Sequence, residues 1–225
     1  MAGNIAPNII TDGLVLYLDA ANTKSYTSSS TTWLDLVGTN NGTLINGPTF
    51  NSANGGSIVF DGTNDYYNLT NSIIDTMNTI NIWVNMLATN VCPILYYGSD
   101  NFDSNLWTWG IAVYPMGVHG FNESPLNYPT TNLYTESVTT NMWKNFTLVR
   151  NDSGNVKLYK NGIFVGSKIG YGTTAIRNSG DRLYIAKSAS TYGNFKIAKT
   201  SIYNRALSAS EVLQNYNATK TRFGL

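Results

Sequence analysis

The feature that most constrains the fold is a pair of turns inside residues 141–166, which read NMWKNFTLVRNDSGNVKLYKNGIFVG. Strand-like runs at residues 142–150, 156–160 and 163–166 are separated by Asn-Asp-Ser-Gly-Asn and by the Asn-Gly pair at 161–162. Asn-Gly favours a type I′ turn, because that turn needs positive φ at both central positions and joins antiparallel strands. Apolar residues alternate along the last two runs, so one face of each strand contacts a core. The sequence predicts an antiparallel meander.

A second strong strand pattern covers residues 79–87. Four apolar residues face one way and three other residues face the opposite way, which places this strand near the centre of a sheet. The apolar set is Ile80, Ile82, Val84 and Met86, and the opposite set is Asn81, Trp83 and Asn85. A chain of 225 residues is long enough for one large β-sandwich. No repeat or linker is visible, so we expect an N-terminal arm over residues 1–11 and a single domain over 12–225.

One helix is expected near the C-terminus, over residues 209–217. Ser208 and Glu211 have the spacing of a capping box, in which the serine hydroxyl accepts from the third helical amide and the glutamate accepts from the cap amide. Leu207 and Val212 flank this box and form the matching hydrophobic staple.

The order of these motifs resembles the laminin G-like, concanavalin A-like jelly-roll domains. The residues that carry the resemblance are GLVLYLDA at 13–20, WLD at 33–35, SIVFDG at 57–62, TINIWV at 79–84, the central meander and IYNRALSASEV at 202–212. The resemblance implies an all-β chain, an antiparallel β-sandwich of about 12 to 14 strands with one short C-terminal helix. It does not by itself imply one activity, because one fold supports many functions.

Composition excludes several classes of protein. Charged residues make up 12% of the chain and the net charge is +1, so there is no basic patch of the kind that nucleic acid requires. The single cysteine, Cys92, cannot form an intrachain disulfide. Apolar runs are far shorter than the ~20 residues of a membrane helix, and residues 1–10 lack the features of a signal peptide.

Catalytic residues are not evident in the sequence. A glycosidase needs two carboxyl groups about 5–10 Å apart, and relatives of the resembling fold that cleave β-glucans place them on one strand face as Glu-x-Asp-x-x-Glu. The only glutamates, Glu123, Glu136 and Glu211, do not occur in that sequence pattern. Glu211 is explained by the helix cap. The only histidine, His119, lies between glycines with no nucleophile motif beside it, which is typical of a loop residue. We therefore expect no enzymatic activity.

Calcium is the one metal that the sequence could hold. Asp61, Asn64 and Asp65 form a compact group of oxygen ligands, and the resembling domains often bind Ca²⁺ through such loops. The same residues are also typical of a hairpin turn. The turn is the favoured interpretation, and no other cofactor is expected.

Aromatic residues are a second group that could bind a ligand, and the chain has 15 tyrosines and 5 tryptophans. Tyr and Trp rings stack on sugars while their polar tips form hydrogen bonds. Tyr96, Tyr97, Trp107 and Trp109 surround one predicted loop and are the candidate glycan-binding residues. The alternative is that at least one of the two tryptophans packs in the core.

Two functions remain open at this point. The first is a non-catalytic structural or accessory protein of a bacteriophage virion, made in the host cytoplasm, whose sandwich decorates the capsid or tail. Its partners would be copies of itself, other virion proteins and host-surface glycans. The second is a stand-alone cellular lectin. The resemblance favours the first, since the start and end of the chain are similar to phage structural proteins. The arm, with Ile5, Ile9 and Ile10, is expected to dock on another subunit.

Overall fold

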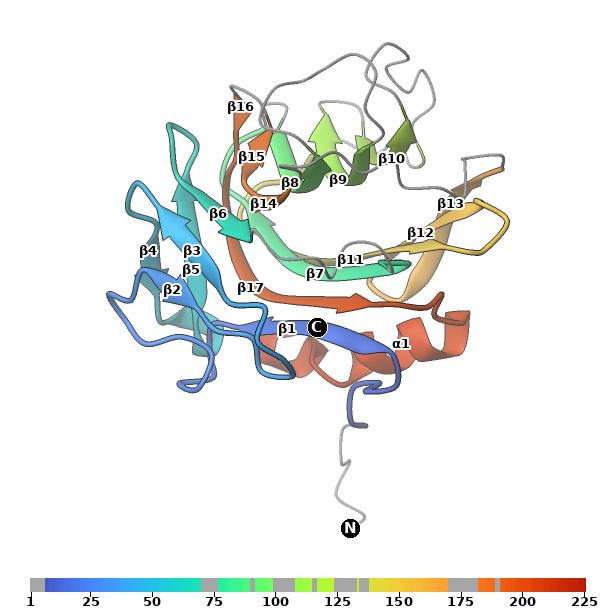
Figure 1. Cartoon of the computed structure of the whole chain (residues 1–225), viewed down its shortest axis with the longest axis horizontal. Helices are drawn as coiled ribbons and strands as arrows, with labels where there is room; N and C mark the ends of the chain where they lie inside the picture. The colour runs from blue at the N-terminus through green and yellow to red at the C-terminus, as the bar shows by residue number, and fades with distance from the viewer. Residues whose placement is uncertain are drawn as a thin grey trace.

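Two antiparallel β-sheets packed face to face form the body of the protein in a computed structural model (Figure 1). The structure describes residues 7–69, 77–89, 92–98, 108–114, 117–123, 133, 138–169, 182–188 and 191–225. Seventeen strands lie within these ranges. The prediction of an all-β sandwich with one short C-terminal helix is confirmed. The expected number of strands was too low, because edge strands of two or three residues are too short to show alternation.

Sheet A has eight strands within the described residues. In spatial order seven of them are β13 (Ile163–Lys168), β12 (Val156–Lys160), β11 (Trp143–Arg150), β7 (Thr79–Met86), β17 (Asn194–Tyr203), β5 (Ser57–Asp61) and β4 (Thr49–Asn51). The eighth, β1 (Leu14–Asp19), pairs with the second half of β17. Strand β17 is long enough to pair with β5 near its start and with β1 near its end.

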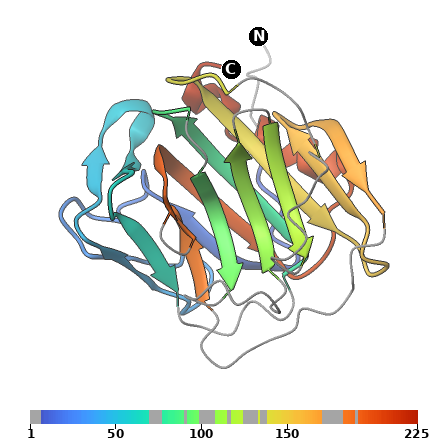
Figure 2. The same cartoon turned by 90° about the horizontal axis from the view of Figure 1, so that it is seen from above.

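Sheet B has seven strands within the described residues and lies across sheet A (Figure 2). In order they are β10 (Gly117–Glu123), β9 (Thr108–Tyr114), β8 (Cys92–Gly98), β14 (Arg182–Ile185), β6 (Tyr66–Leu69), β3 (Gly42–Ile45) and β2 (Thr32–Trp33). A small ribbon of β15 (Lys187–Ser188) and β16 (Thr191–Tyr192) continues from β14 at the rim. A short 3-10 helix, η1 (Ala53–Gly55), links β4 to β5.

The predicted meander is β11–β12–β13, and its Asn-Gly turn has the expected backbone. Asn161 has φ of 51° and Gly162 has φ of 77°. Strand β7 lies between β11 and β17 and is buried along its whole length, which confirms its predicted central position. Its apolar set packs in the main core between the sheets, where it joins Phe60, Leu158 and Phe195.

The outer face of sheet A is covered by the C-terminal segment, which comprises α1 (Ala209–Asn217) and the 3-10 helix η3 (Lys220–Phe223) (Figure 1). Trp83 projects from β7 to this face and stacks on Phe223, with ring centroids 4.1 Å apart, and on Tyr216 at 5.7 Å. Its indole Nε1 donates to Thr219 Oγ1 at 3.0 Å. No helix within the described ranges is long and apolar enough to cross a membrane.

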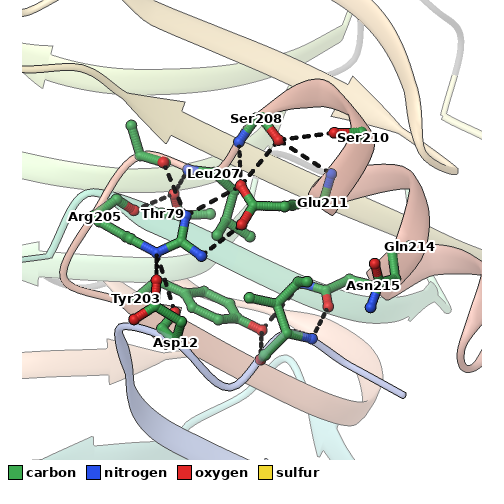
Figure 3. A network of polar contacts seen from close by, with 12 residues as sticks. Asp12, Thr79, Tyr203, Arg205, Leu207, Ser208, Ser210, Glu211, Gln214 and Asn215 are labelled. Carbon is green, nitrogen blue, oxygen red and sulfur yellow. Dashed lines mark hydrogen bonds and ion pairs between the residues drawn. The ribbon is translucent and has the colours of Figure 1, made fainter. Parts of the chain in front are cut away.

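The capping box is present as predicted (Figure 3). Glu211 N donates to Ser208 Oγ at 3.3 Å, and Ser208 N donates to Glu211 Oε2 at 2.8 Å. Arg205 lies between two carboxylates, 2.6 Å from Glu211 Oε1 and 2.8 Å from Asp12 Oδ2. The cap therefore also ties the start of the domain to the start of the helix.

Part of the predicted arm contacts α1 of its own chain. Ile10 N donates to Asn215 Oδ1 at 2.8 Å, and Ile10 O accepts from the Tyr203 hydroxyl at 3.0 Å. Gln214 Nε2 donates to Asn8 O at 2.9 Å. Residues 1–6 lie outside the described ranges. Docking of the arm on another copy therefore stays a prediction.

Candidate functional site

The outer face of sheet B carries the candidate site. On β6, Tyr67 and Leu69 pack in the core, so Tyr66 and Asn68 project from the opposite face. On β14, Leu183 packs in the core and Tyr184 projects outward, directly opposite Asn68 in the register. Two neighbouring strands thus place tyrosine and asparagine side chains side by side on one surface.

Three tyrosines and one lysine meet there, and we name them the rim cluster: Tyr66, Tyr184, Lys187 and Tyr192. The Tyr66 ring is 6.0 Å from the Tyr184 ring with an interplanar angle of 61°. It is 6.3 Å from the Tyr192 ring at 41°. Lys187 Nζ lies 4.6 Å from the Tyr66 centroid and 5.0 Å from the Tyr184 centroid. Both are cation–π contacts, so the ammonium is held against ring faces.

A kink in the backbone brings Lys187 into the cluster. In a regular strand Tyr184 and Lys187 would point to opposite faces, because they are three residues apart. Ala186 between them has φ of 67°, in the left-handed region. Its N–H donates to Ile94 O at 3.1 Å, and its carbonyl accepts from Gly193 N at 2.9 Å. This conformation costs an alanine about 1–2 kcal/mol, and such strain is concentrated at functional sites.

The cluster has a buried floor and an accessible rim. Tyr184 is only 2% exposed, whereas Tyr66, Lys187 and Tyr192 are half-buried. Beside the floor, Asn68 Oδ1 is buried and has no hydrogen-bond partner among the residues that the structure describes. Aromatic faces with a few polar groups among them are the usual lining of a site for a small polar ligand with an apolar face, such as a sugar.

Among the residues predicted to bind glycans, only Tyr97 has a described side chain. Tyr97 is 3% exposed and belongs to the main core, so it does not reach the surface. Tyr96 lies opposite Tyr184 in the register, and Trp109 lies opposite Tyr97. The side chains of Tyr96 and Trp109, and all of Trp107, lie outside the described residues, so their part in binding stays a prediction.

Sequence reasoning missed all four residues of the rim cluster. The alternation Tyr-Tyr-Asn-Leu over β6 contains a usable signal, since its apolar members mark the core face and leave Tyr66 outside. The positions of Lys187 and Tyr192 depend on the kink at Ala186, and an alanine gives no sign of positive φ in a sequence.

The three residues predicted to hold calcium form the turn between β5 and β6. Asp61 Oδ1 accepts from Thr63 N at 2.7 Å, and Asp65 Oδ2 accepts from Asp61 N at 3.3 Å. Asn64 O accepts from Asn46 Nδ2 at 2.8 Å. The bond from the Thr63 amide lowers the pKa of Asp61, whereas burial raises the pKa of Asp65. Within the described ranges, no three His, Cys, Asp or Glu side chains converge on one point. These contacts describe a turn, and calcium binding stays a prediction.

Carboxylates on the helix side form structural contacts. The side-chain bond from Arg205 lowers the pKa of Glu211 to about 2. Asp19 Oδ1 is 2.7 Å from Arg222 Nη1, and Asp19 Oδ2 accepts from the Tyr17 hydroxyl at 3.3 Å. Lys199, 2% exposed, lies 4.8 Å over the Tyr17 ring, and burial lowers its pKa to about 8. This group fixes η3 against sheet A.

The structure gives only partial positions for the other residues that were considered for catalysis. His119 and Glu123 lie on β10, but their side chains are not among those described. Glu136 lies outside the described residues altogether. The expectation that these residues have no catalytic role therefore stays a prediction.

Comparison with solved structures shows proteins of the same fold. Trypanosoma rangeli sialidase in complex with sialic acid matches with a TM-score of 0.69 and 16% identity, over 97% of this chain and 36% of that chain. Domain 4 of AbnA, an extracellular arabinanase from Geobacillus stearothermophilus, in complex with arabinotriose, matches with a TM-score of 0.62 and 16% identity, over 90% of this chain and 98% of that one. This chain thus spans just over a third of the sialidase. At these identities the likeness shows the fold.

Comparison by sequence gives the family. No curated protein matches the chain. A family model of the laminin G type, described as the concanavalin A-like lectin/glucanases superfamily, matches residues 61–213. The match includes strands β6 to β17, which belong to both sheets, and the start of α1, in agreement with the resemblance carried by the motifs. The chain therefore belongs to the concanavalin A-like lectin/glucanase superfamily.

Proposed function

We propose that this protein is a non-catalytic carbohydrate-binding sandwich whose ligand lies on the rim cluster. The observation that carries this proposal is the cluster itself, with three tyrosine rings and an ammonium on the outer face of sheet B. Tyrosine rings offer a flat apolar face to a sugar, and their hydroxyls and the nearby amide of Asn68 offer hydrogen bonds.

The structural neighbours support a carbohydrate ligand. The AbnA domain has nearly the same extent as this chain, and its structure contains arabinotriose. The sialidase structure contains sialic acid, although only part of that protein resembles this chain. Neither identifies the sugar that this protein binds.

The contacts of the carboxylates support a role without catalysis. A hydrolase of this fold needs a carboxylic acid that is free to give up a proton and a second carboxylate facing it. Glu211 is held as an anion by Arg205, and Asp19 is paired with Arg222. Asp61 and Asp65 accept backbone amides of one turn. Each of these groups is engaged in holding the fold.

The setting that we propose is a bacteriophage virion, as a capsid decoration or tail-associated subunit. Residues 8–12 and the C-terminal segment lie on the α1 side of sheet A, whereas the rim cluster lies on the outer face of sheet B. A copy attached through its α1 side would direct the cluster away from the particle. A stand-alone cellular lectin is the alternative. Mass spectrometry of purified particles separates the two, since only the first places the chain in a virion.

The carbohydrate proposal is tested by a glycan array followed by calorimetry on the best ligand. Tyr66→Ala and Tyr192→Ala should each weaken binding about tenfold, since one aromatic contact contributes about 1 kcal/mol or more. Phe164→Ala, which removes an exposed aromatic ring from β13 on the other sheet, is the matched control and should bind normally. An array with no bound glycan, or unchanged affinity in both tyrosine variants, would contradict the proposal.

A further inference from the structure

We propose that the outer face of sheet A carries a second carbohydrate site, in which Trp143, Asn85 and Lys196 bind a neutral saccharide. We name these three residues the Trp143 row. They belong to β11, β7 and β17, on the other sheet from the rim cluster, so this site goes beyond the proposed function and does not rest on it. The proposal comes from the amide of Asn85, which is buried but unpaired among the described residues.

The register of sheet A places the three side chains next to one another. Asn85 lies opposite Trp143 on one side and opposite Lys196 on the other. Both neighbours of Asn85 along β7 pack in the main core, and so do both neighbours of Lys196 along β17. The two side chains therefore project from the outer face, where directly opposed residues have Cβ atoms about 4.5–5.5 Å apart. Trp83, two residues back along β7, stacks on Phe223, so the row lies beside η3.

Two asparagines on the outer face of β7 differ in their partners. Asn81 is 3% exposed, and its Nδ2 donates to Thr147 Oγ1 at 2.6 Å and to Asn145 Oδ1 at 3.1 Å. Asn85 is 7% exposed, yet its buried Oδ1 accepts no hydrogen bond from the described part of the chain. A buried acceptor without a donor costs free energy, and a ligand that supplies a donor removes that cost. The amide of Asn85 therefore indicates a ligand at this position.

Trp143 supplies a fixed aromatic surface beside that amide. Its Nε1 donates to Asn54 Oδ1 at 3.0 Å, and its ring centroid lies 4.8 Å from that of Phe223 at an interplanar angle of 46°. The side chain is half-buried, so part of the indole stays accessible. A ring that is already held in place loses little freedom on binding, and a flat apolar surface suits the C–H face of a sugar.

A hydroxyl group matches the other two residues better than a charged or an apolar group. Lys196 is half-buried, has no ion pair or hydrogen bond within the described ranges, and offers donors only. A hydroxyl can accept from Lys196 Nζ and donate to Asn85 Oδ1, whereas a carboxylate or a sulfate has no proton to donate. The Asn85 amide can turn toward such a ligand without breaking any hydrogen bond in the described part of the chain. A saccharide combines hydroxyls with an apolar ring face for Trp143.

The test starts from a double variant, Tyr66→Ala with Tyr192→Ala, which removes two rings of the rim cluster and leaves the Trp143 row intact. On a glycan array this variant should still bind neutral glycans, and calorimetry then measures the strongest of them. In the same background, Asn85→Leu and Lys196→Met should each weaken binding about tenfold, because a sugar hydroxyl loses a partner. Lys157→Met, at an exposed lysine of β12, is the matched control and should leave the affinity unchanged.

Melting temperatures separate binding from a structural role. Leucine has nearly the shape of asparagine, so Asn85→Leu removes an unpaired amide and should melt at or above the temperature of its parent. Asn81→Leu breaks the bonds to Asn145 and Thr147, so it should melt lower and still bind the glycan. On the wild-type chain, the indole N–H resonance of Trp143, assigned from its absence in Trp143→Phe, should shift when the glycan is added.

The outcomes keep this site apart from the rim cluster. If the wild type binds a neutral glycan and the double variant does not, the second site is overturned while the proposed function stands. Unchanged affinity in Asn85→Leu, or a Trp143 resonance that does not move, also overturns it. If the double variant binds as tightly as the wild type and Asn85→Leu abolishes that binding, the second site stands and the rim cluster is not the site. If neither protein binds a neutral glycan, the second site fails.

Discussion

The outer faces of the two sheets are built in opposite ways. On sheet A the outer face is covered by α1, η3 and residues 8–12 (Figure 1), and many of its polar groups are paired, as around Arg205 and Tyr203 (Figure 3). Asn81 and Asn145, for example, each donate to the other's side-chain oxygen, at 3.1 and 3.2 Å. On sheet B the outer face has half-buried tyrosines, a lysine against ring faces and a buried Asn68 oxygen that accepts no hydrogen bond from the described part of the chain.

This difference agrees with the function that we propose, in which the helix side stabilises the fold and the cluster side binds the ligand. Paired buried polar groups help to fix a single structure, whereas strained backbone, as at Ala186, is concentrated at functional sites. Substitutions should therefore change the free energy of unfolding on the helix side and the affinity for a ligand on the cluster side.

The largest effect is expected for Trp83→Ala. Trp83 is fully buried beneath α1, where it stacks on Phe223 and Tyr216 and donates to Thr219. Its loss leaves a cavity, and the free energy of unfolding should fall by about 3–5 kcal/mol in a urea titration. Tyr192→Ala, in the half-buried rim cluster, should change it by less than about 1 kcal/mol. Equal losses of unfolding free energy in the two variants would contradict the proposed difference between the two sheet faces.

Deleting residues 1–11 is expected to cost about 2 kcal/mol. The truncation removes the two main-chain bonds of Ile10 and the bond from Gln214 to Asn8, each of which contributes about 0.5–1.5 kcal/mol. The sandwich should stay folded, because its core lies elsewhere. Deleting only residues 1–6 is the control and should leave the melting temperature unchanged. Light scattering on the same variants measures whether the arm also joins copies, which a fall in mass would show.

Glu211→Gln should weaken the helix side in a way that depends on pH. A carboxyl group whose pKa is lower in the folded state stabilises the fold above the pKa of the unfolded state, about 4.3. That contribution disappears as the pH falls toward the folded value of about 2. The Arg205 pair is partly exposed, so we expect about 1–2 kcal/mol at neutral pH and no difference from wild type near pH 2. Asp152→Asn, a substitution in an exposed turn, is the control. Its stability relative to wild type should not change in this way as the pH falls.

The smallest effect is expected for calcium. The oxygens of Asp61 and Asp65 accept backbone amides in the turn before Tyr66, so millimolar Ca²⁺ and a chelator should give the same melting temperature. Bound calcium would instead stabilise the protein by RT ln(1 + [Ca²⁺]/Kd). A calcium-dependent rise in melting temperature that Asp61→Asn abolishes would establish a metal site in the turn between β5 and β6.

Much of the fold could be predicted because it depends on local patterns. Three examples are the alternation along β7, the Asn-Gly turn at 161–162 and the capping box at Ser208. Each is a local backbone geometry that favours particular residue types at fixed spacings, so the sequence pattern predicts it. The candidate site was not predictable in the same way. Tyr97 was predicted to bind glycans but packs in the core. The residue type alone does not show which face of a strand a tyrosine lies on.

By itself, the sequence determined the antiparallel meander, the central strand, the helix and its cap, because backbone preferences and apolar periods act over a few residues. Only the tertiary structure decided which sheet face the helix covers. It also decided that Ala186 adopts positive φ and brings Lys187 over Tyr66 and Tyr184. The physical reason is that contacts such as Lys187 with Tyr66 and Trp83 with Phe223 join residues more than a hundred positions apart, and their energies arise only when the chain has folded.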